Sequence, residues 1–233
     1  MKALFLNIIL LIVAVSATAQ IRPVESLPIA VNYSKTIHLI FPSAVKYSQA
    51  VTDFVAVDNP ENVPHILRIK ANSKSFSKQT TVSVATEGGF FYSFNVSYAD
   101  SLEQTNYFLP GMTSINPDTV FINEVSQTHL IAPEKVIYID YGDTCINVSK
   151  AENTENIIRM IARTGSVQQF PKQTNVSFAT ESGRFFTFNV DYRDKPDAFV
   201  YEVGEKKPEK KANVILTDNI IPAGERDDVM NRG

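Results

Sequence analysis

Residues Lys78–Asp100 read KQTTVSVATEGGFFYSFNVSYAD, and residues Lys172–Asp194 read KQTNVSFATESGRFFTFNVDYRD. Fifteen of the 23 aligned positions are identical, at an offset of 94 residues. A shorter block upstream repeats as well, because the His-Leu-Ile that starts at His38 recurs at His129, 91 residues further on. Self-similarity of this kind marks repeated structural units. The chain therefore contains two copies of one unit in tandem.

The repeated block has the period of a β-hairpin. In the first copy one alternating set comprises Phe90, Tyr92, Phe94, Val96 and Tyr98. Alternation with a period of two predicts a strand that buries one face. Val82 and Val84 alternate in the same way, and Glu87-Gly88-Gly89 between the two runs tolerates the positive φ of a tight turn. The hairpin should recur in the second copy, with Phe94 and Phe188 at equivalent buried sites.

Short strands are expected throughout each copy. In the first copy they fall near residues 36–41, 45–48, 52–57 and 67–69, in addition to the hairpin. No segment carries a helical stripe of useful length, and prolines interrupt the chain repeatedly. The sequence therefore predicts an all-β protein with two tandem homologous small domains, each a β-sandwich or a partly open barrel.

The first 19 residues have the features of a cleaved export signal. Lys2 precedes an almost wholly apolar run over residues 3–15, and Ala17-Thr18-Ala19 forms a small-x-small cleavage site before Gln20. The apolar run is shorter than the roughly 20 residues that a membrane helix needs. We therefore expect an exported protein, periplasmic or associated with the outer membrane, and at most peripheral to a membrane.

The remaining boundaries follow the repeats. The predicted organisation is a signal peptide at 1–19, an N-terminal extension at 20–35, a first β-domain at 36–100, a linker at 101–127, a second β-domain at 128–194 and a charged C-terminal tail at 195–233. Turn dipeptides make the linker a candidate hinge. Within the tail, residues 213–221 are apolar enough for a further strand or a partner-binding segment.

Composition limits the classes of partner and the sources of stability. The formal net charge of −3 offers no general attraction to a phosphate backbone, so nucleic acid is not expected as a direct partner. Cys145 is the only cysteine, which excludes an intramolecular disulfide. It lies in an apolar-polar alternation and is interpreted as a small strand residue. Stability must therefore come from burial of apolar side chains.

The polar residues do not form a recognisable catalytic set. The chain has no nucleophile elbow, phosphate loop, H-E-x-x-H or C-x-x-C motif. His38 and His129 could share a metal, but they lack converging ligands and are interpreted as structural. Asp100 and Asp194 end equivalent strands and are interpreted as turn residues rather than a catalytic pair. His65 is expected in a loop or at a strand edge. We predict no catalytic, metal or cofactor site, and no enzyme.

The segments Ile37–Pro42 and Thr80–Asp100 resemble the N-terminal β-domain of TraN proteins, which belong to the transfer apparatus of conjugative transposons. A weaker similarity extends to TrbG-type subunits of type IV secretion rings, which are periplasmic β-sandwich scaffolds. The resemblance implies a non-enzymatic assembly component that contacts other transfer-apparatus proteins and can form an oligomer. The alternative is an exported surface-binding module, of adhesin or carbohydrate-binding type, whose aromatic residues would have to be exposed.

Overall fold

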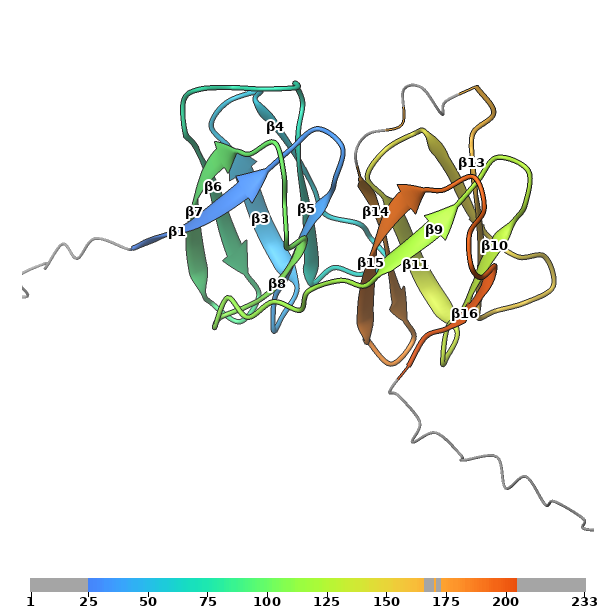
Figure 1. The fold of residues 1–233 in the computed structure, drawn as a ribbon. Coiled ribbons are helices and arrows are strands. Elements are labelled where there is room, and N and C mark those ends of the chain that lie inside the picture. Colours follow the sequence, from blue (N-terminus) through green and yellow to red (C-terminus); the bar gives the residue numbers. More distant parts are fainter. Residues whose placement is uncertain (1–24, 166–169, 171–172, 205–233) are drawn as a thin grey trace, which may run out of the picture. The chain divides into compact units, whose positions relative to one another are not determined.

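The computed structural model describes residues 25–165, 170 and 173–204. These residues form sixteen β-strands and no helix, arranged as four sheets of four strands (Figure 1). The all-β prediction is confirmed. The predicted signal peptide at 1–19 and the apolar segment 213–221 lie outside the described residues.

The first domain consists of two sheets that we call A and B. Sheet A contains, in spatial order, β1 (Ser26–Val31), β7 (Phe91–Tyr98), β6 (Thr80–Thr86) and β3 (Val45–Ala50). Sheet B contains β4 (Val55–Asp58), β5 (Ile66–Ala71), β2 (Ile37–Ile40) and β8 (Asn106–Phe108). The pairs β1–β7 and β2–β8 are parallel, and the other neighbours are antiparallel.

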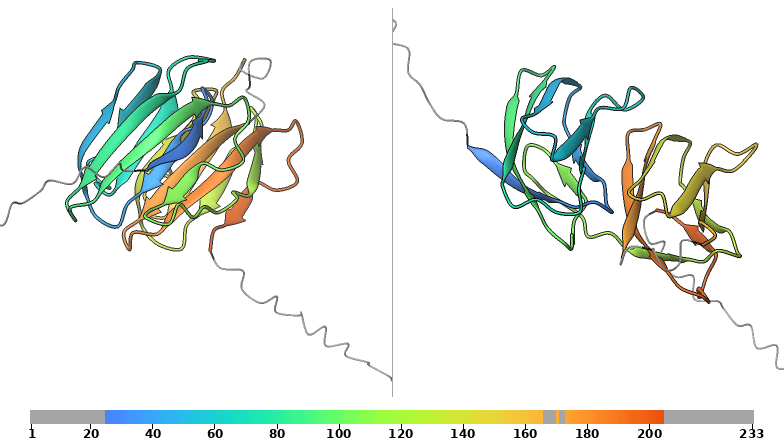
Figure 2. Two further views of the ribbon diagram at one scale, coloured as in Figure 1. Left: turned by 90° about the vertical axis from the view of Figure 1, so that its left-hand side faces the viewer. Right: turned by 90° about the horizontal axis from the view of Figure 1, so that it is seen from above.

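The second domain repeats this arrangement strand for strand. Sheet C contains β9 (Thr119–Ile122), β15 (Phe185–Tyr192), β14 (Thr174–Thr180) and β11 (Val136–Tyr141). Sheet D contains β12 (Ile146–Lys150), β13 (Ile157–Ala162), β10 (Thr128–Ile131) and β16 (Val200–Glu202). The sheets are open, so each domain is a sandwich and not a barrel (Figure 2).

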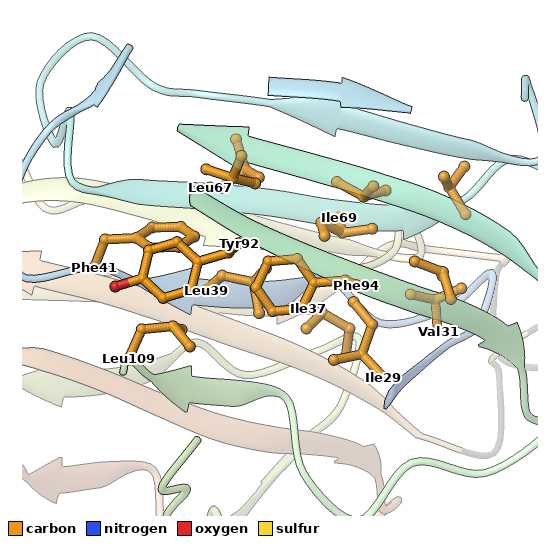
Figure 3. Packing of buried hydrophobic residues seen from close by; sticks show 14 of the residues in the cluster. Ile29, Val31, Ile37, Leu39, Phe41, Leu67, Ile69, Tyr92, Phe94 and Leu109 are labelled. Carbon is orange, nitrogen blue, oxygen red and sulfur yellow. The ribbon is translucent and has the colours of Figure 1, made fainter. Parts of the chain in front are cut away.

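The core of each domain lies between its two sheets. In the first domain, Phe94 from sheet A is fully buried in one cluster with Leu39 and Ile69 from sheet B (Figure 3). These are the inward residues of the period-two pattern, since their neighbours along each strand point to the outer face. Full burial of one such side chain stabilises the fold by about 1.5–3 kcal/mol.

The second core distributes its aromatic volume differently. Phe178 is fully buried at the position that Val84 occupies in the first domain. Phe188, the counterpart of Phe94, is only half-buried and stacks on Phe178 with 6.2 Å between ring centroids. The prediction that Phe94 and Phe188 hold equivalent positions is confirmed, but the expectation of equal burial is wrong. Phe178 on the neighbouring strand is larger than its counterpart Val84, and it fills part of the space that Phe94 occupies in the first core.

The hairpin turns conform to the expected chemistry. Gly89 and Gly183 have φ angles of 80° and 83°, in the left-handed region that glycine tolerates. Phe90, however, precedes β7 and is 57% exposed, so its predicted place in the buried set is wrong. It lies at the end of the hairpin, just before the strand.

Each domain extends beyond its repeated sequence block. The predicted extension 20–35 contains β1, the predicted linker 101–127 contains β8 and β9, and the predicted tail 195–233 contains β16. All four strands lie at sheet edges, and three of them have only three or four residues. Strands this short show too little alternation to be recognised from periodicity. The segment between the last strand of the first domain and the first strand of the second therefore shrinks to residues 109–118.

A side-chain turn after the first strand also belongs to the repeat. Asn32 Oδ1 accepts backbone N–H bonds from Ser34 at 3.2 Å and Lys35 at 2.8 Å. Asn123 Oδ1 makes the same two bonds 91 residues later, also at 3.2 and 2.8 Å. The asparagine thus satisfies the amides of the turn that connects the two sheets.

Candidate functional site

The outer face of sheet B packs against the outer face of sheet C. All four residues of β2 and all seven of β14 are buried. Their counterparts β10 and β6 alternate between buried and half-buried residues. A strand with one covered face alternates, so continuous burial shows that a second layer covers β2 and β14. The two domains therefore dock through these faces.

His38 lies at the centre of this contact. Its side chain is fully buried, with Nε2 3.1 Å from Tyr138 Oη and 3.4 Å from Asp140 Oδ2 of the second domain. Burial tends to raise the pKa of Asp140, but bonding to His38 and the charge of Arg68 outweigh it and hold this pKa below its ordinary value. Burial and the nearby Asp140 charge raise the pKa of Tyr138, so its hydroxyl remains protonated.

Arg68 extends this cluster towards the rim. Arg68 Nη1 donates to Asp140 Oδ1 at 2.6 Å, and Nη2 donates to Asp58 of its own domain. Burial tends to lower the pKa of Arg68, but these two carboxylates raise it overall. The guanidinium therefore remains charged and joins both domains through one side chain.

A buried lysine forms a second polar contact. Lys35 is 2% exposed, and its Nζ donates to Leu102 O at 3.0 Å, Gln173 Oε1 at 2.8 Å and Asn189 Oδ1 at 2.9 Å. Burial lowers the pKa of Lys35, and the nearby charge of Asp191 partly opposes the shift. Since an ammonium group has three donors, Lys35 is fully satisfied.

Asn175 completes the polar contacts by pairing with backbone. Thr36 N donates to Asn175 Oδ1 at 3.0 Å, and Asn175 Nδ2 donates to Thr36 O at 2.9 Å. Gly142 lies beside them, where an added Cβ would come within 2.4 Å of Asn175 Oδ1 and of Ser34 O. The close approach of the two domains thus requires glycine at this position.

Apolar residues fill the other end of the contact. Ile40, Val63 and Ile66 of the first domain form one buried cluster with Tyr138 and Ala179 of the second. The Phe185 ring also lies 5.0 Å from that of His38. A packed contact with hydrogen bonds between the two domains restricts their relative motion, which argues against the hinge expected in the linker.

Two cavities at the domain contact have polar walls. One of about 200 Å³ includes Lys35, Asp100 and Asp191, and the other, of about 230 Å³, includes Arg68 and Asp140. Lys35, Arg68 and Asp140 already bond to protein groups. These cavities therefore carry no argument for a bound ligand.

The sequence-selected histidines and carboxylates do not converge. His38 belongs to the domain contact, whereas His129 is half-buried on the outer face of sheet D. His65 is half-buried before β5, and burial lowers its pKa. Asp100 and Asp194 are both exposed, each just after the last strand of its repeated block. The described residues contain no group of three or more His, Cys, Asp or Glu that could hold a metal ion.

Cys145 is buried, but it lies in the turn just before β12 and not in the strand that its sequence context indicated. Burial raises the pKa of its thiol to about 12. A thiol with so high a pKa carries little thiolate near neutral pH.

In the described part of the chain no helix is long and apolar enough to cross a membrane.

Sequence reasoning missed the residues that join the domains. Lys35, Asp140 and Asn175 were not selected, because none belongs to a known motif. Their signal lies in the comparison of the repeats, where the equivalent positions carry Ser126, Gln49 and Thr81. Polar residues that differ between equivalent positions of the two repeats mark the places where the environments of the domains differ.

The outer faces of sheets A and D remain uncovered in the described structure. Sheet A exposes Tyr47 by 47% and Phe91 by 52%. Sheet D carries a third cavity, of about 240 Å³, lined by Arg159 and Ser149 among others. This cavity has the same position in the repeat as the Arg68 cavity. The candidate functional surface is therefore this pair of faces.

Fold and site together define a tandem β-sandwich protein whose domains dock face to face. The chain belongs to the family described as "Domain of unknown function (DUF8473)", which matches residues 29–102 and 120–196. One match falls within each sandwich and ends before its last strand, and the two matches confirm the internal repeat. No curated protein matches the chain.

Several solved structures have a weak overall similarity. Titin Ig tandem domains A164-A165 share 12% identity over 73% of this chain and 95% of that one, with a TM-score of 0.22. The mixed-linkage glucan utilization locus protein SGBP-B of Bacteroides ovatus shares 10% over 76% and 46%, with a TM-score of 0.21. Protocadherin Gamma C5 EC1-3 shares 10% over 76% and 66%, with a TM-score of 0.24. Similarity this low carries no argument about function.

Proposed function

We propose that this chain is an exported, non-enzymatic assembly component that works through protein contacts made by its sheet faces. The observation that supports this proposal is the uncovered face of sheet A. Tyr47 and Phe91 are about half exposed there, next to Phe90 at the hairpin end. Exposed apolar patches with polar surroundings mark interaction sites. Aromatic side chains are also frequent anchors of protein interfaces.

The kind of apparatus in which this component would act is proposed from a resemblance of its sequence to a known family. Ile37–Pro42 and Thr80–Asp100 resemble TraN proteins, so the partners would be other proteins of a conjugative transfer apparatus. The N-terminal signal pattern and the net charge of −3 agree with an exported protein that does not bind DNA directly.

A transfer assay tests this proposal. Cells that lack the chain are complemented with wild type, with the double variant Tyr47→Asp/Phe91→Asp, or with the control Lys74→Asp in an exposed loop. We expect the double variant to reduce the frequency of conjugative transfer severalfold, while the control restores it. Equal transfer by all three, at equal protein levels, would contradict the proposal.

The exposed aromatic rings also support a second candidate, a carbohydrate-binding face. Phe90, Phe91 and Tyr47 meet the condition that a surface-binding module would need exposed aromatics. Affinity electrophoresis in gels that contain β-glucan or other polysaccharides tests it. Retardation of wild type that is lost in Phe91→Ala would favour this candidate over the assembly role.

A further inference from the structure

The two uncovered faces have nearly the same chemistry as the two faces that dock within the chain. On sheet A the outer positions include Tyr47, Ala85 and Phe91, and the equivalent positions on the docked sheet C are Tyr138, Ala179 and Phe185. Ser83 and Asn95 likewise correspond to Ser177 and Asn189. Sheet A therefore presents most of a docking face for which the described chain has no occupant.

The complementary face is repeated as well. On the docked sheet B the outer positions include His38, Ile40, Ile66 and Arg68. The equivalent positions on sheet D are His129, Ile131, Ile157 and Arg159, so all four residue types are retained. The set on sheet B is buried except for half-buried Arg68, whereas all four on sheet D are half-buried.

We propose that the outer face of sheet D in one copy docks onto the outer face of sheet A in a second copy. This contact repeats between molecules the contact that sheets B and C make within one molecule. It deepens the proposed function, because it names the partner of the sheet A face. The two faces differ, so the contact is heterologous and continues from copy to copy.

Exposure at the uncovered positions agrees with this occupant. Tyr47 is 47% exposed and Phe91 52%, whereas the docked Tyr138 is 8% exposed. Val51, 71% exposed, corresponds to Gly142, so its side chain holds two copies further apart at this point than the two domains are within the chain. On the facing sheet the position of Lys70 is taken by Ile161, which offers Val51 an apolar neighbour. The bond that Lys70 Nζ donates to Gly142 O within the chain therefore has no counterpart between copies. Both sides of the contact have changed together towards apolar residues.

Three polar contacts of the docked domains are weakened between copies, because Lys35, Asp140 and Asn175 correspond to Ser126, Gln49 and Thr81. Asp140, which accepts from Arg68 at 2.6 Å, corresponds to Gln49 on sheet A. Arg159 would therefore meet an amide oxygen in place of a carboxylate. The guanidinium is attracted more strongly to a charged carboxylate than to a neutral amide oxygen. The domains within one chain also benefit from a high effective concentration. Association between copies should thus be reversible and dependent on concentration.

Sedimentation velocity on the mature full-length chain tests the proposal. We expect the weight-average mass of wild type to rise with concentration up to about 1 mM, where even weak contacts form. Phe91→Asp on sheet A and Arg159→Asp on sheet D should each remain monomeric. Lys74→Asp, in an exposed loop, should behave as wild type. Wild type that stays monomeric throughout would overturn the proposal.

A mixing experiment then separates this contact from other modes of association. The Phe91→Asp copy keeps its sheet D face, and the Arg159→Asp copy keeps its sheet A face. An equimolar mixture should therefore form a dimer with one copy of each and nothing larger. Two copies that met through identical faces would give no such recovery, and that result would overturn the proposal.

A gain of affinity provides a second, independent readout. Gln49→Asp restores the carboxylate that Arg68 has within the chain, so we expect the association constant to rise roughly tenfold. Association unchanged or weakened by Gln49→Asp would count against the proposed register. If the chain self-associates but Tyr47→Asp/Phe91→Asp leaves transfer intact, only the proposed function fails. If the chain is monomeric but transfer needs these residues, only this inference fails.

Discussion

Arg68 Nη1 in the first domain lies 2.6 Å from Asp140 Oδ1 in the second, and the carboxylate also lies against the buried His38. Removal of one partner from a buried ion pair leaves the other with an uncompensated charge. Arg68 is partly exposed and retains Asp58, which moderates that cost. The pair therefore contributes specifically to docking of the two domains.

Asp140→Ala should lower the free energy of unfolding by about 1–3 kcal/mol, because it removes an acceptor of Arg68 and the carboxylate that lies against the buried His38. Urea denaturation followed by tyrosine fluorescence measures the loss. Gln49→Ala is the matched control, since it changes the equivalent exposed position and should have an effect below about 0.5 kcal/mol. An equal loss of unfolding free energy in both variants would show that Asp140 does not stabilise the protein through the domain contact.

Acid should weaken the same contact. The pKa of Asp140 is lower in the folded protein than in the unfolded chain, where an aspartate titrates near about 3.9. Its contribution is therefore fully present above the unfolded pKa and is lost as the pH falls through the folded pKa. We expect the stability difference between wild type and Asp140→Asn to be constant near neutral pH and to shrink below about pH 4. A difference independent of pH down to 3 would contradict a charged role for Asp140.

Gly142→Ala should disrupt docking by steric conflict. The new Cβ would lie 2.4 Å from Asn175 Oδ1 and 2.8 Å from Lys35 Cα, so the two domains must separate slightly or distort. Overpacking of a tight contact typically costs about 1–3 kcal/mol. Thermal unfolding measures the effect. Val51→Ala, at the equivalent and exposed position, should change the melting temperature little. A Gly142→Ala protein as stable as wild type would indicate a looser contact.

The sequence predicted the period-two strands and missed those without a period. The hairpin from Thr80 to Tyr98 was recognisable because eight-residue β7 repeats its alternation in full. The edge strand β8, with three residues, offers no period, and its place is set by pairing with β2 in three dimensions. The docking face of sheet C could not be predicted from the sequence for a related reason. β6 and β14 share nearly the same sequence, yet only β14 is covered on both sides. The alternation along a single strand does not show which other sheet will pack against its outer face.

The unequal cores give a prediction about the two equivalent phenylalanines. Phe94 is fully buried, whereas Phe188 is half-buried beside Phe178. Phe94→Ala should therefore cost about 3–5 kcal/mol, in the range typical of buried aromatic truncation. Phe188→Ala should cost less, since part of the ring already contacts solvent. Urea denaturation of both variants checks the order. A larger loss for Phe188→Ala would mean that the second core depends on this ring more than its burial indicates.

The two equivalent histidines separate the contact within the chain from the contact proposed between copies. His38→Ala removes a buried ring that contacts Tyr138 and Asp140, so it should lower the free energy of unfolding by about 1–3 kcal/mol. His129→Ala changes a half-buried position on sheet D and should leave stability within about 0.5 kcal/mol of wild type. The same His129→Ala variant should weaken self-association in sedimentation velocity. A His129→Ala protein that associates like wild type would place that side chain outside the contact. One that loses as much stability as His38→Ala would show that the face of sheet D is already covered within the chain.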